Sequence, residues 1–295
     1  MKTRLGIFIF ALLLLPLAGL YLSGAEWSGL ITGSPAEDES IAATLRTSMM
    51  MMFYVLLINY TIKRLSGNGP LDLQRNYFIG VGIASAFTGW LLCYLNVFVA
   101  SWTVQQDNPP LVQFLLYTPL FALLAPAVLV TRALLGTFPG LLRLLACAPA
   151  FPAASGETLA RVLLPLALAG LAGGAAWPVK LFWLLWVSPL LLLVALQLLW
   201  HESTIFSGLK SGDWGRIICT ALSGIVVGNI AVISYQSNAS LTINLPGMLL
   251  AQAGFAVFGL LCLQLSDVLA ENWRGKTLSN APRKKFPIPV VTRKN

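Results

Sequence analysis

The chain has 295 residues, of which 57% are hydrophobic and only 10% are charged, and it contains a single histidine. This composition excludes a water-soluble globule, because far more apolar surface would remain than one core can hide. The lone histidine excludes a membrane haem with paired histidine ligands and argues against a multi-histidine zinc or copper site. We therefore expect the lipid bilayer as the solvent, with no metal and no cofactor.

Long apolar runs predict transmembrane helices, because a hydrocarbon core of ~30 Å needs roughly 20 apolar residues per span. Their continuous apolarity favours helices over a barrel, whose strands would alternate apolar and polar residues. Eight runs follow one another: residues 5–22, 47–62, 77–102, 111–134, 159–177, 181–200, 217–235 and 245–265. The predicted fold class is all-α, a polytopic transmembrane helical bundle of eight segments.

The first run has two interpretations. Lys2 and Arg4 precede it and Ser23-Gly24-Ala25 follows it, which is the layout of a cleavable signal peptide. A retained helix is the interpretation that we favour. Cleavage would leave seven helices and would not change the later loops.

Lysine and arginine predict the orientation of the bundle. Of the 19 basic residues, all except Arg46 and Lys180 fall on the side that also holds the N-terminus. The positive-inside rule then places both termini in the cytoplasm. Compact loops and the signal-like start favour a bacterial inner membrane. The net charge of +8 is thus explained by topology, and we expect no nucleic-acid partner, because no basic patch is interleaved with exposed aromatic residues.

The chain is expected to form one integral membrane domain over residues 1–295. Two halves, 1–134 and 159–270, would be joined by an interfacial cytoplasmic segment, 135–158. The basic tail, 271–295, should attract anionic lipids. A faint repeat links the halves, since Ala86-Phe-Thr-Gly89 and Ala221-Leu-Ser-Gly224 lie at similar distances from the prolines that open the next helices. A parallel duplication would produce this pattern.

Small residues at four-residue spacing predict close helix packing. The candidates are Gly170 with Gly174 and Gly224 with Gly228. Contacts within the chain are the preferred interpretation, and a subunit interface is the alternative.

Polar residues within the spans are amides and hydroxyls. Asn96, Asn229 and Gln252 are the mid-membrane candidates for lining a path or for bonding across helices. Because no ionisable residue lies near the centre of a span, a proton-driven carrier with a carboxylate relay is disfavoured.

The candidates for binding a substrate or a lipid headgroup lie at the cytoplasmic boundary. They are His201, Glu202, Asp213, Arg216, Asp72 and Arg75. His201 is either a metal ligand or general base, or simply an anchor at a helix end. No catalytic residue is assigned, since the motifs of phosphate loops, zinc proteases and serine hydrolases do not occur.

Three functions are compatible with these features. The first is a non-enzymatic accessory or scaffolding subunit of a membrane complex, with other membrane subunits as partners. The second is a transporter of an uncharged or lipid-like solute. The third is a lipid-modifying enzyme that acts at the cytoplasmic headgroup level, which requires His201, Glu202, Asp213 and Arg216 to converge.

Overall fold

The structure, a computed structural model, describes residues 39–104, 109–146, 149–150, 155–237 and 240–273. Within them are seven helices that are long and apolar enough to cross a membrane. They are α3 (Glu39–Ser66), α5 (Arg75–Val99), α6 (Pro110–Leu135), α8 (Gly156–Ala176), α9 (Pro178–Leu199), α10 (Gly215–Gln236) and α11 (Met248–Trp273). The predicted fold class is confirmed: the protein is an all-α, multi-pass membrane bundle. The first predicted span, residues 5–22, lies outside the described residues.

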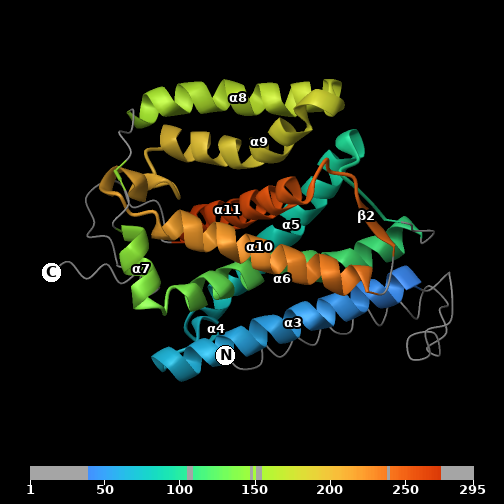
Figure 1. Cartoon of the computed structure of the whole chain (residues 1–295), viewed down its shortest axis with the longest axis horizontal. Coiled ribbons are helices and arrows are strands. Elements are labelled where there is room, and N and C mark those ends of the chain that lie inside the picture. Colours follow the sequence, from blue (N-terminus) through green and yellow to red (C-terminus); the bar gives the residue numbers. More distant parts are fainter. Residues whose placement is uncertain (1–38, 105–108, 147–148, 151–154, 238–239, 274–295) are drawn as a thin grey trace.

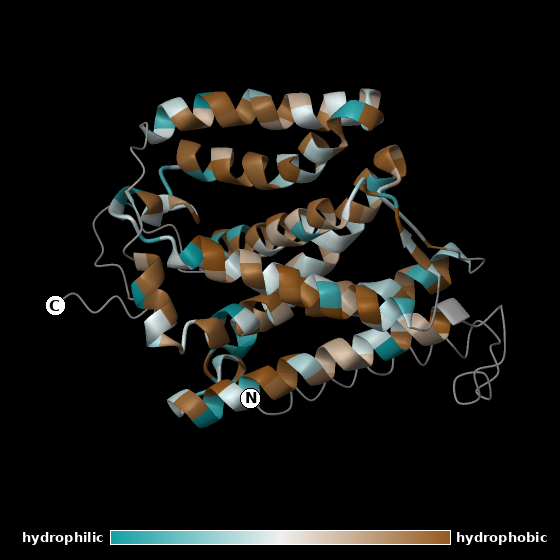
Figure 2. Ribbon diagram, viewed as in Figure 1, coloured by the Kyte–Doolittle hydropathy of each residue, from teal (hydrophilic) through white to brown (hydrophobic). Residues whose placement is uncertain are grey.

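The long helices form a row in which each contacts the next. From top to bottom of Figure 1 the order is α8, α9, α11 with α5, α10 with α6, and α3. Apolar residues run along the length of these helices (Figure 2). We call one end of the bundle the basic end. There α3, α6, α9 and α11 finish and α5, α8 and α10 begin.

Proline and serine set several helix boundaries. Helices α6 and α9 begin at Pro110 and Pro178, where a proline loses no hydrogen bond within the helix. Ser155 caps α8 by accepting a hydrogen bond from the backbone N–H of Thr158 over 3.2 Å. Trp177 alone separates α8 from α9, so these helices run antiparallel as the short connection predicts.

Gly170 and Gly174 face α9 within this α8–α9 pair. A Cβ atom added to Gly174 would lie 2.6 Å from the Cβ of Leu185, so a larger side chain would push the helices apart. A Cβ added to Gly170 would meet Ser188 and Leu184. The structure therefore places this glycine pair in a contact inside the chain.

Two further helix pairs each carry a short strand in the connection between the helices. Hairpin A consists of α5, β1 (Trp102–Val104) and α6, and hairpin B consists of α10, β2 (Leu241–Ile243) and α11. Gly224 of hairpin B lies against the backbone of α11, where an added Cβ would be 2.7 Å from the Cα of Gly259. Gly228 faces Phe255, which is also on α11.

The two strands join the hairpins at the end of the bundle opposite the basic end. They pair antiparallel, with Thr103 opposite Thr242 and the two hydroxyl groups hydrogen-bonded. The sequence predicted plain polar loops here. Paired strands form because backbone groups near the membrane surface are stabilised when they bond to one another.

Short helices cover the basic end. They are α4 (Pro70–Leu73), α7 (Pro139–Ala146) and the 3₁₀ helix η1 (Ser207–Ser211). Helix α7 lies in the connection predicted to be interfacial, and it contacts the start of α10. The backbone N–H of Trp214 donates to the carbonyl of Leu145 over 3.2 Å, and its indole N–H donates to the carbonyl of Pro149 over 3.1 Å.

The largest apolar core lies between hairpins A and B and the helices beside them. Val81, Val128, Val130, Val194 and Val227 are all buried there. Side chains from α3, α5, α6, α9, α10 and α11 contribute to this one cluster. The contact between the hairpins is thus filled by apolar side chains.

Candidate functional site

The six residues predicted to bind a headgroup do not form one site. Asp72, an exposed residue of α4, pairs with Lys63 over 3.0 Å. Asp213 accepts a hydrogen bond from the backbone N–H of Gly215 over 3.0 Å, so its carboxylate stabilises the start of α10. The Nε of Arg75 is buried without a hydrogen-bond partner among the described residues.

His201 and Glu202 form the turn after α9. His201 is exposed and has a φ of 57°, in the left-handed region. The backbone N–H of Glu202 donates to the carbonyl of Gln197 over 2.9 Å. Within the described part of the chain, no hydrogen bond or ion pair joins His201 to Asp213 or Arg216. The convergence required by a lipid-modifying centre is therefore not seen in these contacts.

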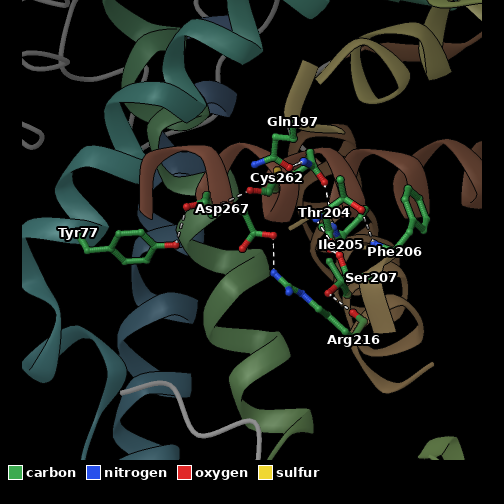
Figure 3. Close-up of polar contacts among 12 residues, drawn as sticks. Tyr77, Gln197, Thr204, Ile205, Phe206, Ser207, Arg216, Cys262 and Asp267 are labelled. Carbon is green, nitrogen blue, oxygen red and sulfur yellow. Dashed lines mark hydrogen bonds and ion pairs between the residues drawn. The ribbon is translucent and has the colours of Figure 1, made fainter. Parts of the chain in front are cut away.

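Arg216 instead pairs with Asp267, a residue that the sequence did not assign to a site. Arg216 lies in the first turn of α10 and Asp267 near the end of α11, so the ion pair joins the two helices of hairpin B (Figure 3). Both side chains are largely shielded, with exposures of 29% and 20%. Solvent therefore screens the attraction within this pair less than the attraction within the exposed pair of Lys63 and Asp72.

A second arginine, Arg132, lies beside this pair. It is in the last turn of α6, is partly buried, and is within electrostatic reach of Arg216, Asp267 and Tyr77. The Tyr77 hydroxyl, from the start of α5, donates to the backbone carbonyl of Ser266 over 3.1 Å. Both hairpins thus contribute to one polar cluster at the basic end, which we call the arginine cluster: Tyr77, Arg132, Arg216 and Asp267.

The arginine cluster holds two guanidinium groups and one carboxylate. The Nε atoms of Arg132 and Arg216 are buried and have no hydrogen-bond partner among the described residues. Buried donors in proteins nearly always have a partner, so each of these atoms needs an explanation. The sequence did offer a signal, since Arg132 stands inside an apolar run, but its charge also fitted the orientation rule.

The polar residues in the spans bond to one another. Asn229 of α10 and Gln252 of α11 exchange two amide hydrogen bonds, over 2.6 and 3.0 Å. Gln197 of α9 and Gln264 of α11 are fully buried and hydrogen-bonded to each other (Figure 3). These amides tie helices together. The side-chain N–H group of Gln197 is buried and has no hydrogen-bond partner among the described residues.

Asn96 lies in the last turn of α5 and not at the middle of a span. Its side-chain N–H donates to the carbonyl of Trp102 over 2.8 Å, and its oxygen accepts from the backbone N–H of Trp102 over 3.3 Å. Asn96 therefore holds β1 against the end of α5. The expectation of a mid-membrane position for this residue is wrong, because α5 ends only at Val99.

The described residues offer no cluster of three or more histidine, cysteine or acidic side chains placed to hold a metal ion. Cys93, Cys219 and Cys262 are free thiols in or beside apolar packing. The arginine cluster is suited to binding an anion, since its two guanidinium groups present N–H donors.

Searches for similar proteins returned no match to this chain among family models, curated proteins or solved structures.

Proposed function

We propose that this protein is a non-enzymatic subunit that assists or scaffolds another membrane complex. The observation that carries the proposal is how the polar residues within the spans are used. Asn229 with Gln252, and Gln197 with Gln264, bond to each other across helices. Side chains that line a solute path would instead face an opening and exchange their bonds with solute.

The packing between the hairpins supports the same proposal. A transporter built from two repeated units would hold its substrate near the membrane midplane between them. In this protein that contact contains buried valine and leucine side chains, including Val128, Val227 and Leu261. A rigid packed core suits a protein whose role is to present a fixed surface to a partner.

The separation of the ionisable residues weighs against the enzyme alternative. Asp213 accepts a hydrogen bond from the first residue of α10, Asp72 is paired with Lys63, and His201 is exposed. General acid–base chemistry requires such groups within hydrogen-bond reach of one reacting atom. A supporting role in a complex makes no such demand.

Native mass spectrometry after gentle extraction from the membrane tests the proposal. We expect one or more protein partners to copurify at a fixed stoichiometry. When the affinity tag is placed on the partner instead, this chain should copurify with it. The double variant His201→Ala and Asp213→Ala should leave that stoichiometry unchanged. Purification of this chain with only lipid or solute, under conditions that preserve other membrane complexes, would contradict the proposal.

A further inference from the structure

We propose that the arginine cluster binds the phosphate of an anionic phospholipid. The cluster draws on four helices of the two hairpins: Tyr77 from α5, Arg132 from α6, Arg216 from α10 and Asp267 from α11. Arg216 and Asp267 are joined as an ion pair, while Arg132 lies within electrostatic reach of both. Figure 3 shows Tyr77, Asp267 and Arg216 at one place in the bundle. This inference concerns a ligand site and does not depend on the scaffolding role.

The position of the cluster matches the depth of lipid headgroups. Arg132 is in the last turn of α6, and Arg216 is in the first turn of α10. Because roughly 20 residues suffice to cross the hydrocarbon core, the terminal turns of helices this long lie among the headgroups. Basic pockets between helices at this depth are typical binding places for phosphate groups of lipids.

The charge of the cluster is incomplete. Among the described residues, the cluster counts two guanidinium groups and one carboxylate, an excess of one positive charge. The buried Nε atoms of Arg132 and Arg216 also lack hydrogen-bond partners among the described residues. A bound oxyanion would supply the missing negative charge and accept hydrogen bonds from both guanidinium groups.

The chemistry of the cluster favours a phosphodiester. The planar guanidinium presents paired donors whose geometry matches two oxygens of a phosphate. A phosphodiester carries a single negative charge, which equals the charge left over in the cluster. Asp267 would repel a doubly charged phosphate monoester, so it acts as a selectivity residue as well as the partner of Arg216.

Lipid binding to the purified protein measures the proposal directly. The probe is phosphatidylglycerol, compared with zwitterionic phosphatidylcholine, titrated in detergent and counted by native mass spectrometry. The variant Arg132→Gln should weaken the first phosphatidylglycerol site by about tenfold, because it removes one charged donor pair. The control Arg143→Gln removes an exposed arginine on α7, at the same end of the bundle, and should leave the site unchanged.

The variant Asp267→Asn gives a result that simple loss of structure would not produce. Asparagine has the same shape and can still accept from Arg216, but the cluster then carries two positive charges. We expect tighter binding of phosphatidylglycerol and a preference shifted toward phosphatidic acid. Weaker binding of both lipids in a folded Asp267→Asn protein would overturn the assigned role of the carboxylate.

Two further outcomes test the source of the phosphate and the specificity of the site. Displacement of the lipid by millimolar inorganic phosphate would overturn a lipid ligand in favour of a soluble one. An equal loss of binding in Arg132→Gln and Arg143→Gln would overturn the site and leave only general attraction to a basic surface. Because neither result depends on a protein partner, failure here is distinguishable from failure of the scaffolding role.

Discussion

In hairpins A and B the two helices cross at similar positions, but different groups make the close contact. In both, a small-residue pair on the first helix crosses a phenylalanine and a small residue on the second. Ser85 and Gly89 cross Phe121 and Ala125 in hairpin A, as the contacts of Ser85 and Gly89 show. Gly224 and Gly228 cross Phe255 and Gly259 in hairpin B.

The difference between the crossings lies in how close approach is stabilised. In hairpin A the Ser85 hydroxyl donates to the carbonyl of Phe121 and accepts from the N–H of Ala125 over 3.1 Å. Both bridged residues of α6 lie between Pro119 and Pro126, the two prolines inside this helix. Hairpin B has backbone against backbone at Gly224 and Gly259. In hairpin A a serine hydroxyl thus bridges the two helices through hydrogen bonds, and in hairpin B two glycines let the helix backbones approach each other.

A polar contact follows the crossing in both hairpins. The indole N–H of Trp90 donates to the hydroxyl of Thr118 over 3.0 Å in hairpin A. The hydrogen-bonded pair of Asn229 and Gln252 holds the corresponding place in hairpin B. In each hairpin the first partner comes one residue after the second small residue of the crossing, Gly89 or Gly228. The second partner comes three residues before the phenylalanine, Phe121 or Phe255. Thus the pattern of contacts is shared although the residue types are not.

The largest expected effect is at the crossing of hairpin B. Gly224→Leu places side-chain atoms where the backbone of α11 already lies, and backbone cannot move aside as a flexible side chain can. We expect a loss of about 3 kcal/mol or failure to fold. Thermal unfolding in detergent checks this. Gly254→Leu is the matched control, because an added Cβ on this residue of α11 meets nothing within 4 Å; equal losses would refute a specific crossing.

A smaller effect is expected at the crossing of hairpin A. Ser85→Ala leaves two backbone groups of α6 without their bridging hydroxyl, which should lower the free energy of unfolding by about 2 kcal/mol. Thr88→Ala is the control, because among the described residues its hydroxyl bonds only to the Ala84 carbonyl in its own helix. Similar melting temperatures for the wild-type protein and Ser85→Ala would contradict the bridging role.

The polar contacts should differ in strength between the hairpins. A double-mutant cycle with Asn229→Leu and Gln252→Met should give a coupling of about 1 kcal/mol, since two hydrogen bonds are lost. The cycle with Trp90→Phe and Thr118→Val should give about half that, since one is lost. The coupling free energies follow from unfolding measurements on all four proteins of each cycle. A larger coupling free energy in hairpin A than in hairpin B would contradict the prediction.

The smallest effect is expected where the hairpins meet through their strands. Thr103→Val together with Thr242→Val removes an exposed hydroxyl pair and should cost about 0.5 kcal/mol. The backbone pairing of β1 with β2 remains. Hydrogen exchange at the two strands is the sensitive measurement, and a loss of protection across the whole bundle would show a larger role than expected.

Much of the fold could be predicted from the sequence. Continuous apolar runs and prolines such as Pro110 and Pro178 indicate the helices directly, because the bilayer demands length and apolarity. The register between the halves could not be predicted. The sequence pattern aligned Gly89 with Gly224, whereas the contacts make it equivalent to Gly228, one helical turn further on. Gly89 faces Phe121, and Gly228 faces Phe255. The division of the chain into duplicated halves stays a prediction.

The candidate site was harder to predict because its members are far apart in the chain. Arg216 and Asp267 are 51 residues apart, and only the packing of α10 on α11 brings them together. The positive-inside rule already accounted for Arg132, so nothing in the sequence indicated a binding role for this residue. The β1–β2 pair was missed because three-residue strands have no recognisable periodicity.

The strand pair also bears on the order in which the protein is made. Thr103 and Thr242 are 139 residues apart, so their pairing must wait until hairpin B has been synthesised and inserted. Helices α5 and α6 can associate long before that moment. The pairing of β1 with β2 is consequently among the last contacts to form. A chain halted before residue 241 would have its first half inserted, with β1 still unpaired to β2.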